Sequence, residues 1–123
     1  MSKAEQMLYS TPDELEIAIA YTILVHKNLH QVATLLSAIY RNQNIYCVHV
    51  DTKSPQQFQK GVKLMTKCFP NVFEATKKER VVYASFSRLK AEVNCMRDLL
   101  RVPTTMSNWK HLINLCGQVK NLR

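Results

Sequence analysis

The stretch that decides the fold is Asn44-Ile45-Tyr46-Cys47-Val48-His49-Val50-Asp51-Thr52-Lys53, an apolar run that ends in an acid, a hydroxyl and a base. Val48 and Val50 suit the pleated surface of a strand, and residues 51–55 supply the turn and cap residues that end it. In an open α/β sheet, ligands bind beyond the carboxyl ends of the strands. We therefore expect Asp51 and Lys53 to lie at a ligand-binding edge of the sheet.

The residues before this stretch predict another strand and a helix. Apolar residues alternate over 17–26, and the positions between them are also largely apolar, as in a central strand covered on both faces. Asn28 can cap the following helix, whose buried face is predicted to be Val32, Leu35, Leu36, Ile39 and Tyr40. Strand, helix and strand joined by short links predict a parallel, right-handed βαβ unit.

The residues after Lys53 predict a second helix and a short strand. Ser54 is expected to be the N-cap and Pro55 the first helical residue. The inner face of this helix is predicted to be Phe58, Val62, Met65 and Phe69. Gly61 should weaken the helix by roughly 1 kcal/mol relative to alanine. Residues 71–75 then read as a short strand.

The last third of the chain predicts a strand-like run, a helix and a final strand. Residues 81–86 are β-like, and Ser87 is expected to cap a helix with the inner face Leu89, Val93, Met96 and Leu100. A last buried strand is expected within residues 109–116. This alternation predicts an α/β fold with a mostly parallel sheet and flanking helices. Three helices cover four or five strands poorly, which indicates part of a larger domain.

Composition narrows the possible functions only in part. The chain has 123 residues and a formal net charge of +8, which favours anionic partners, although basic surfaces also occur without any ligand. Its four cysteines allow three pairings if all are bonded, and the absence of a C-x-x-C pair argues against structural zinc. We find no secretory signal, no membrane-spanning run and no glycosylation sequon, so the sequence by itself predicts a cytosolic location.

The motifs leave a small set of candidate site residues. Glycine-rich phosphate loops, H-E-x-x-H, G-x-S-x-G and D-x-D are all missing, which argues against dinucleotide enzymes, NTPases and common metal or nucleophile sites. His26, Asp51, Lys53 and Tyr83 remain as polar residues at or near strand ends. Each has an ordinary structural explanation, such as a turn aspartate or a solvated lysine. Their shared position is what indicates a site.

Five blocks of sequence resemble one known family, the core 2 and I-branching β-1,6-N-acetylglucosaminyltransferases of glycosyltransferase family 14. The resemblance runs from about Ser10 to Gly117, and the blocks occur in the family's order: residues 38–40, 45–53, 81–85, 94–99 and 109–117. It implies a partial GT-A-like, Rossmann-like fold and a Golgi type II membrane protein. The implied reaction transfers GlcNAc from UDP-GlcNAc to a galactose or GalNAc hydroxyl of a glycan in β-1,6 linkage, with inversion and without a metal or other cofactor.

The resemblance also implies roles for individual residues. The implied UDP-sugar contacts are Leu24, Val25, His26, Asp51, Thr52, Lys53 and Tyr83. Cys47 and Cys95 correspond to a disulfide pair, Cys68 to a cysteine with a partner further upstream, and Cys116 to an unpaired one. Residues 118–123 depart from the family pattern, and the acceptor half with its general base has no counterpart here.

The resemblance divides the chain into a lead-in at 1–14, the donor-nucleotide half at 15–117 and a divergent tail at 118–123. We therefore predict UDP-GlcNAc as the partner, a glycan acceptor only in full-length relatives, and an inactive chain when it is alone. Two alternatives remain. One is a non-catalytic interaction or regulatory fragment, and the other is a basic nucleic-acid-binding module, for which no lysine and arginine cluster with interleaved aromatic residues is present.

Overall fold

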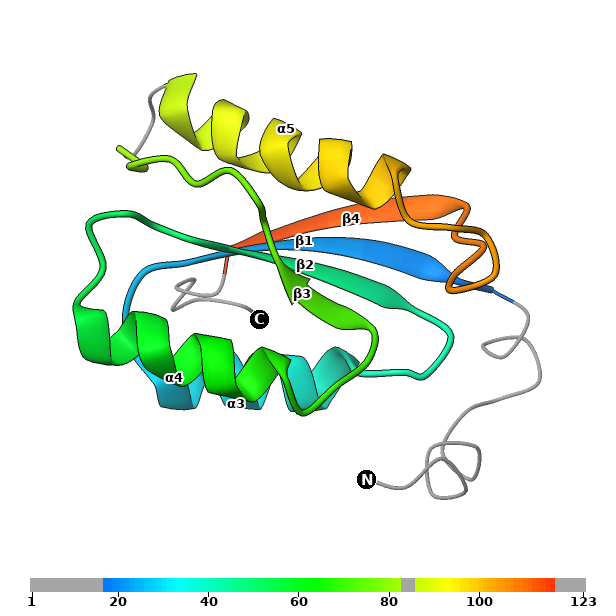
Figure 1. The fold of residues 1–123 in the computed structure, drawn as a ribbon, viewed down its shortest axis with the longest axis horizontal. Coiled ribbons are helices and arrows are strands. Elements are labelled where there is room, and N and C mark those ends of the chain that lie inside the picture. Colours follow the sequence, from blue (N-terminus) through cyan, green and yellow to red (C-terminus); the bar gives the residue numbers. More distant parts are fainter. Residues whose placement is uncertain (1–16, 83–85, 117–123) are drawn as a thin grey trace.

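The computed structural model describes residues 17–82 and 86–116, which form one parallel sheet between two layers of helices (Figure 1). The strands are β1 (Ile19–Val25), β2 (Ile45–Val50), β3 (Val72–Glu74) and β4 (His111–Cys116). The helices are α3 (Leu29–Ile39), α4 (Gln56–Thr66) and α5 (Phe86–Leu100). The strand order is β3-β2-β1-β4, and each neighbouring pair is parallel. This arrangement confirms the predicted α/β fold.

The strand β2 is the most buried part of the sheet. Every residue of β2 is buried, and β2 lies between β1 and β3. The register pairs Ala20 with Ile45 and Val25 with Val50, so β1 and β2 end side by side. Because successive side chains alternate between the two faces of a sheet, β1 and β2 each contribute to two separate cores.

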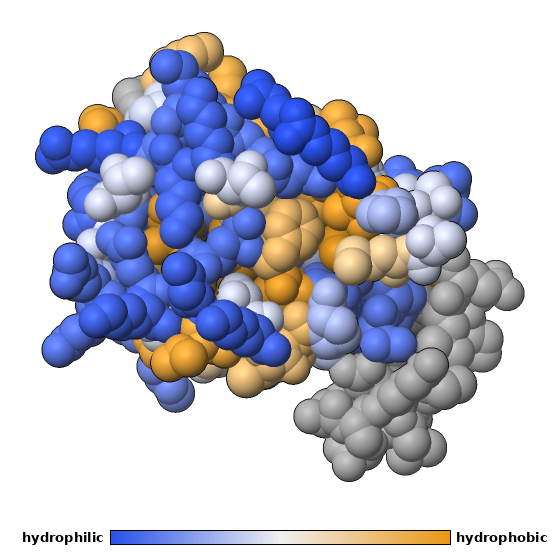
Figure 2. All heavy atoms as spheres, viewed as in Figure 1, coloured by the Kyte–Doolittle hydropathy of each residue, from blue (hydrophilic) through white to orange (hydrophobic). Residues whose placement is uncertain are grey.

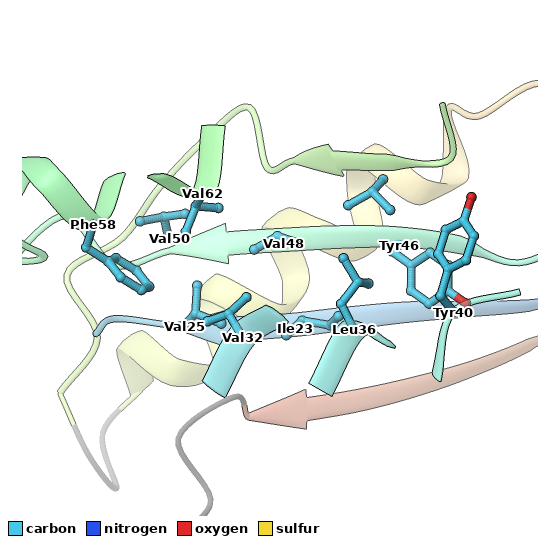
Figure 3. Close-up of a cluster of buried hydrophobic side chains, with 11 residues drawn as sticks. Ile23, Val25, Val32, Leu36, Tyr40, Tyr46, Val48, Val50, Phe58 and Val62 are labelled. Carbon is cyan, nitrogen blue, oxygen red and sulfur yellow. The ribbon is translucent and has the colours of Figure 1, made fainter. Parts of the chain in front are cut away.

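One core lies between the sheet and the pair α3 and α4 (Figure 3). It is formed by the buried side chains of Ile23, Val25, Val32, Leu36, Tyr40, Tyr46, Val48, Val50, Phe58, Val62 and Val72. Both predicted helix faces are therefore confirmed. The predicted cap of α3 is also present, because Asn28 Oδ1 accepts a hydrogen bond from the Gln31 amide at 3.1 Å.

The other core lies under α5 and is smaller. It contains Ala20, Ile45, Cys47, Ala75, Cys95 and Leu99. In this core the sulfur atoms of Cys47 on β2 and Cys95 on α5 form a disulfide, with a Cα–Cα distance of 5.7 Å. Among the described residues, Cys68 and Cys116 are free thiols.

The predicted inner face of α5 was wrong. The buried residues of this helix are Ala91, Asn94, Cys95, Asp98 and Leu99. At 100° per residue, the expected residues form a stripe on the opposite side, and their exposed fractions are 50% for Leu89, 40% for Val93, 36% for Met96 and 74% for Leu100. Apolar side chains are visible over α5 at the upper margin of Figure 2, between hydrophilic ones.

Polar side chains explain why α5 turns this way. Asp98 accepts hydrogen bonds from the Thr76 amide at 2.8 Å and from the Thr76 hydroxyl at 2.9 Å. Asn94 donates to the carbonyl of Lys77 at 3.1 Å. These bonds satisfy the loop after β3, and together with the disulfide they outweigh the apolar periodicity that predicted the other face.

Two expectations about the chain around residue 81 were also wrong. Val81 and Val82 are not in a strand, because the amide of Val81 bonds to a carboxylate oxygen of Asp51 instead of a neighbouring strand. Ser87 is not a cap, because α5 already begins at Phe86. The Ser87 hydroxyl accepts a hydrogen bond from the Val82 amide at 2.8 Å.

Ser54 and β4 also differ from the expectations. Helix α4 begins at Gln56 with Pro55 at the cap position, and within the described residues the buried Ser54 hydroxyl has no hydrogen-bond partner. The strand β4 forms as predicted but is not buried, because it is the edge strand beside β1. Within residues 17–82 and 86–116, no helix is long and apolar enough to cross a membrane.

Candidate functional site

The candidate site lies at the carboxyl ends of β1 and β2. The register that pairs Val25 with Val50 continues one step further, since the Asp51 amide donates to the Val25 carbonyl at 3.0 Å. His26 and Asp51 therefore follow adjacent strand ends, as the sequence predicted. The pKa of the partly buried His26 is lowered by burial first, then by the positive charges of Lys27 and Lys53, while Asp51 acts in the opposite direction. The charges of Asp51 and Lys53 thus lie close enough to His26 to affect its pKa.

The carboxylate of Asp51 is buried and holds the surrounding backbone. Its residue is 2% exposed, Oδ1 accepts the Lys53 amide at 2.9 Å, and Oδ2 accepts the Val81 amide at 3.1 Å. This is the Asx-turn arrangement that gives an aspartate a purely structural use. Asp51 therefore holds the backbone of residues 53 and 81 in place at this edge, with or without a bound ligand.

Lys53 supplies an accessible positive charge at the site. Its side chain is 43% exposed, and its ammonium lies 3.6 Å from Asp51 Oδ2. The same Nζ donates to the Val81 carbonyl at 2.7 Å. An ammonium has three donors, and the exposure of Lys53 leaves it accessible to an anion at the strand ends.

The other predicted contacts differ in what they present. Leu24 and Val25 are 5% and 2% exposed, so their side chains belong to the interior and only their backbone is suited to a ligand contact. Thr52 is exposed, and its amide donates to the Glu79 carbonyl at 3.2 Å. Tyr83 lies outside the described residues.

His49 is a residue of this edge that the sequence prediction missed. It is fully buried, and its Nε2 accepts the amide of Glu79 at 2.8 Å. Burial lowers the pKa of His49, which favours the neutral imidazole that this bond requires. The available signal was a histidine placed inside an apolar strand two residues before Asp51.

One hollow formed by described residues lies away from this edge. It has a volume of about 750 Å³ and is lined by residues of α3, by Met65 of α4, by Phe69, and by Tyr40 and Arg41, which precede the amino end of β2. It is therefore at the opposite end of the sheet from Asp51. Among residues 17–82 and 86–116, no group of three or more histidine, cysteine or acidic side chains is arranged to hold a metal ion.

The fold and the polar strand ends define an open parallel α/β domain, a class that binds ligands at the carboxyl edge of its sheet. The comparisons with known proteins identify the family within this class. A model of the Core-2/I-Branching enzyme family matches residues 19–119. The chain belongs to this family, as the resemblance in its sequence predicted.

The curated relatives are enzymes by name. The chain is 48% identical over 118 residues to beta-1,3-galactosyl-O-glycosyl-glycoprotein beta-1,6-N-acetylglucosaminyltransferase 3 of Homo sapiens, which covers 94% of this chain and 26% of the relative. Identity and coverage are the same for the corresponding transferase of Bovine herpesvirus 4 and for transferase 3 of Bos taurus. The chain thus spans about a quarter of the length of the curated relatives it matches.

Proposed function

We propose that this chain is the donor-nucleotide part of a β-1,6-N-acetylglucosaminyltransferase that binds the uridine diphosphate of UDP-GlcNAc at the ends of β1 and β2. The observation that carries the proposal is the alignment of His26, Asp51 and Lys53 at one edge of a parallel sheet. Family membership supplies the reaction class, because the relatives are named as β-1,6-N-acetylglucosaminyltransferases. The negative diphosphate would face the exposed ammonium of Lys53.

The remaining features of the activity are part of the same proposal. The reaction would attach GlcNAc to a galactose or GalNAc hydroxyl with inversion, in the Golgi, and without a metal ion, since basic side chains would hold the diphosphate. The general base and the acceptor site would come from a part of the family's domain that these 123 residues do not match. Removing a general base alone costs about 10²–10⁴-fold in rate, so we expect no transfer by the isolated chain.

Calorimetric titration of the purified chain with UDP tests the donor site. Lys53→Ala removes one accessible charge and should weaken binding by about tenfold, the size of one charge-assisted hydrogen bond. Lys60→Ala is the matched control, because Lys60 is also exposed but lies on α4. Binding should persist in EDTA.

Absence of heat at millimolar UDP in the wild-type chain would overturn the proposal. Equal losses in Lys53→Ala and Lys60→Ala would instead indicate a general charge effect. A steep fall of affinity with salt, accompanied by binding of unrelated nucleic acid, would favour the nucleic-acid alternative.

A further inference from the structure

The segment from Glu79 to Val81 is fastened to the end of β2 by four hydrogen bonds. His49 Nε2 accepts the Glu79 amide at 2.8 Å, and the Thr52 amide donates to the Glu79 carbonyl at 3.2 Å. The Val81 amide donates to Asp51 at 3.1 Å, and the Lys53 ammonium donates to the Val81 carbonyl at 2.7 Å. The segment therefore determines where the charge of Lys53 is held, and it leads directly to Tyr83 in the sequence.

His49 is the member of this group whose bond depends on its protonation state. A nitrogen that accepts an amide N–H must carry a lone pair, so the imidazole is neutral with its proton on Nδ1. That Nδ1 is buried and has no hydrogen-bond partner among the described residues. Protonation would turn Nε2 into a donor that faces the Glu79 amide, and the bond would be lost.

The surroundings of His49 favour the neutral imidazole. Burial is the largest influence on the pKa of His49 and lowers it, and Lys78 acts in the same direction. Asp51 and Glu79 are the negative groups near the ring and act in the opposite direction. The neutral form consequently persists to a lower pH than that of an exposed histidine, and acidification removes it.

We propose that neutral His49 is a positioning residue of the nucleotide edge, which holds Glu79–Val81 against the end of β2 and thereby fixes the ammonium of Lys53 for the diphosphate. The effect on ligand binding rests on the proposed function, whereas the effect on the segment does not. His49 does not need to touch the ligand, and no other described side chain accepts the Glu79 amide.

Two variants of His49 distinguish the effect of its hydrogen-bond acceptor from the effect of its side-chain volume. His49→Gln offers an amide oxygen to the Glu79 N–H and should bind UDP about as tightly as the wild type near neutral pH. His49→Leu fills similar space without an acceptor and should bind at least about tenfold more weakly, the size expected for an unpaired buried N–H. Circular dichroism verifies that both variants are folded.

The pH profile is the readout that a merely structural residue would not change. UDP and His26 titrate in every sample, so the measured quantity is the ratio of the wild-type dissociation constant to that of His49→Gln, followed from neutral pH down to the lowest pH at which circular dichroism shows both proteins folded. We expect this ratio to rise as the pH falls, because only the wild type loses its acceptor. A ratio that stays constant would overturn the proposal, even if His49→Leu fails to fold.

Amide hydrogen exchange tests the segment without any ligand. Protection of the Glu79 amide, corrected for intrinsic exchange, should decrease on acidification in the wild type and remain constant in His49→Gln. Full protection in His49→Leu would contradict the proposal. If the wild-type chain binds no UDP but its Glu79 amide still loses protection on acidification, only the donor site is refuted. The role of His49 in holding the segment is then supported.

Discussion

At the scale of single residues, Asp51 shows that the position of a polar residue at a strand end is easy to predict from sequence. Its hydrogen-bond partners are harder to predict. The position of Asp51 after an apolar run was sufficient to place it beside His26 and Lys53. Its bond from the Val81 amide could not be predicted, because the two residues are 30 apart in the chain. His49 was missed for the same reason, since its partner Glu79 belongs to a loop with no regular pattern.

Gly61 gives a residue-scale prediction about stability. A Cβ added at Gly61 would lie 2.6 Å from Cδ2 of Leu29, but that atom is the end of a flexible side chain that is 38% exposed. We therefore expect Gly61→Ala to raise the free energy of unfolding by less than the roughly 1 kcal/mol that helix propensity alone supplies. Leu29→Ala combined with Gly61→Ala should recover the full gain relative to Leu29→Ala.

Urea denaturation of the four proteins measures both effects. A large destabilisation by Gly61→Ala in the presence of Leu29, with none in its absence, would show that Leu29 cannot move aside. Equal gains in both backgrounds would show that the close approach has no energetic consequence.

At the scale of elements, α5 shows the limit of reasoning from hydrophobic periodicity. The helix has apolar residues on two opposite sides, and the pattern selects the side with the larger ones. The buried side includes Asn94 and Asp98, whose bonds to residues 76 and 77 no helical period can reveal. For α3 and α4 the pattern succeeded, because each has one apolar side and it faces the sheet.

Two adjacent leucines of α5 test the orientation of this helix. Leu99 is fully buried, whereas Leu100 is 74% exposed. Leu99→Ala should lower the free energy of unfolding by about 2–5 kcal/mol, as expected for a core leucine. Leu100→Ala should change it by no more than about 0.5 kcal/mol.

Denaturation is followed with the disulfide intact, so that only packing differs between the two variants. The reverse order of effects would mean that α5 turns its larger apolar residues toward the sheet, as the periodicity predicted. Similar losses of stability in the two variants would mean that Leu99 and Leu100 are about equally buried.

At the scale of the whole molecule, the sequence predicted the class of fold better than the extent of burial. Alternating strands and helices identified the parallel sheet, because short links between strand and helix allow few other arrangements. The order β3-β2-β1-β4 places β4 at an edge, and no local pattern specifies which apolar strand receives only one neighbour. The apolar residues of β4 predicted a buried strand, but its position at the edge leaves it exposed.

The disulfide is the covalent connection between the sheet and α5. It links residues separated by 48 positions, and closure of a loop of this length is worth about 4 kcal/mol in the chain-entropy model. We expect reduction to lower the free energy of unfolding by about that amount. Urea denaturation with and without dithiothreitol measures the difference.

A Cys47→Ala and Cys95→Ala double variant is the control for this experiment. It should show no response to dithiothreitol, because the remaining thiols Cys68 and Cys116 are not bonded to each other. A response of the double variant equal to that of the wild type would assign the effect to another bond.

The position of β1 has a consequence for how the chain is made. This strand is synthesised before the other described strands, yet it lies inside the sheet and one of its neighbours is β4. Thr22 on β1 and Asn114 on β4, which bond to each other, are 92 residues apart. During synthesis, one side of β1 stays without its partner β4 until the residues between them have emerged, so the nascent protein is exposed to wrong strand pairing during that interval.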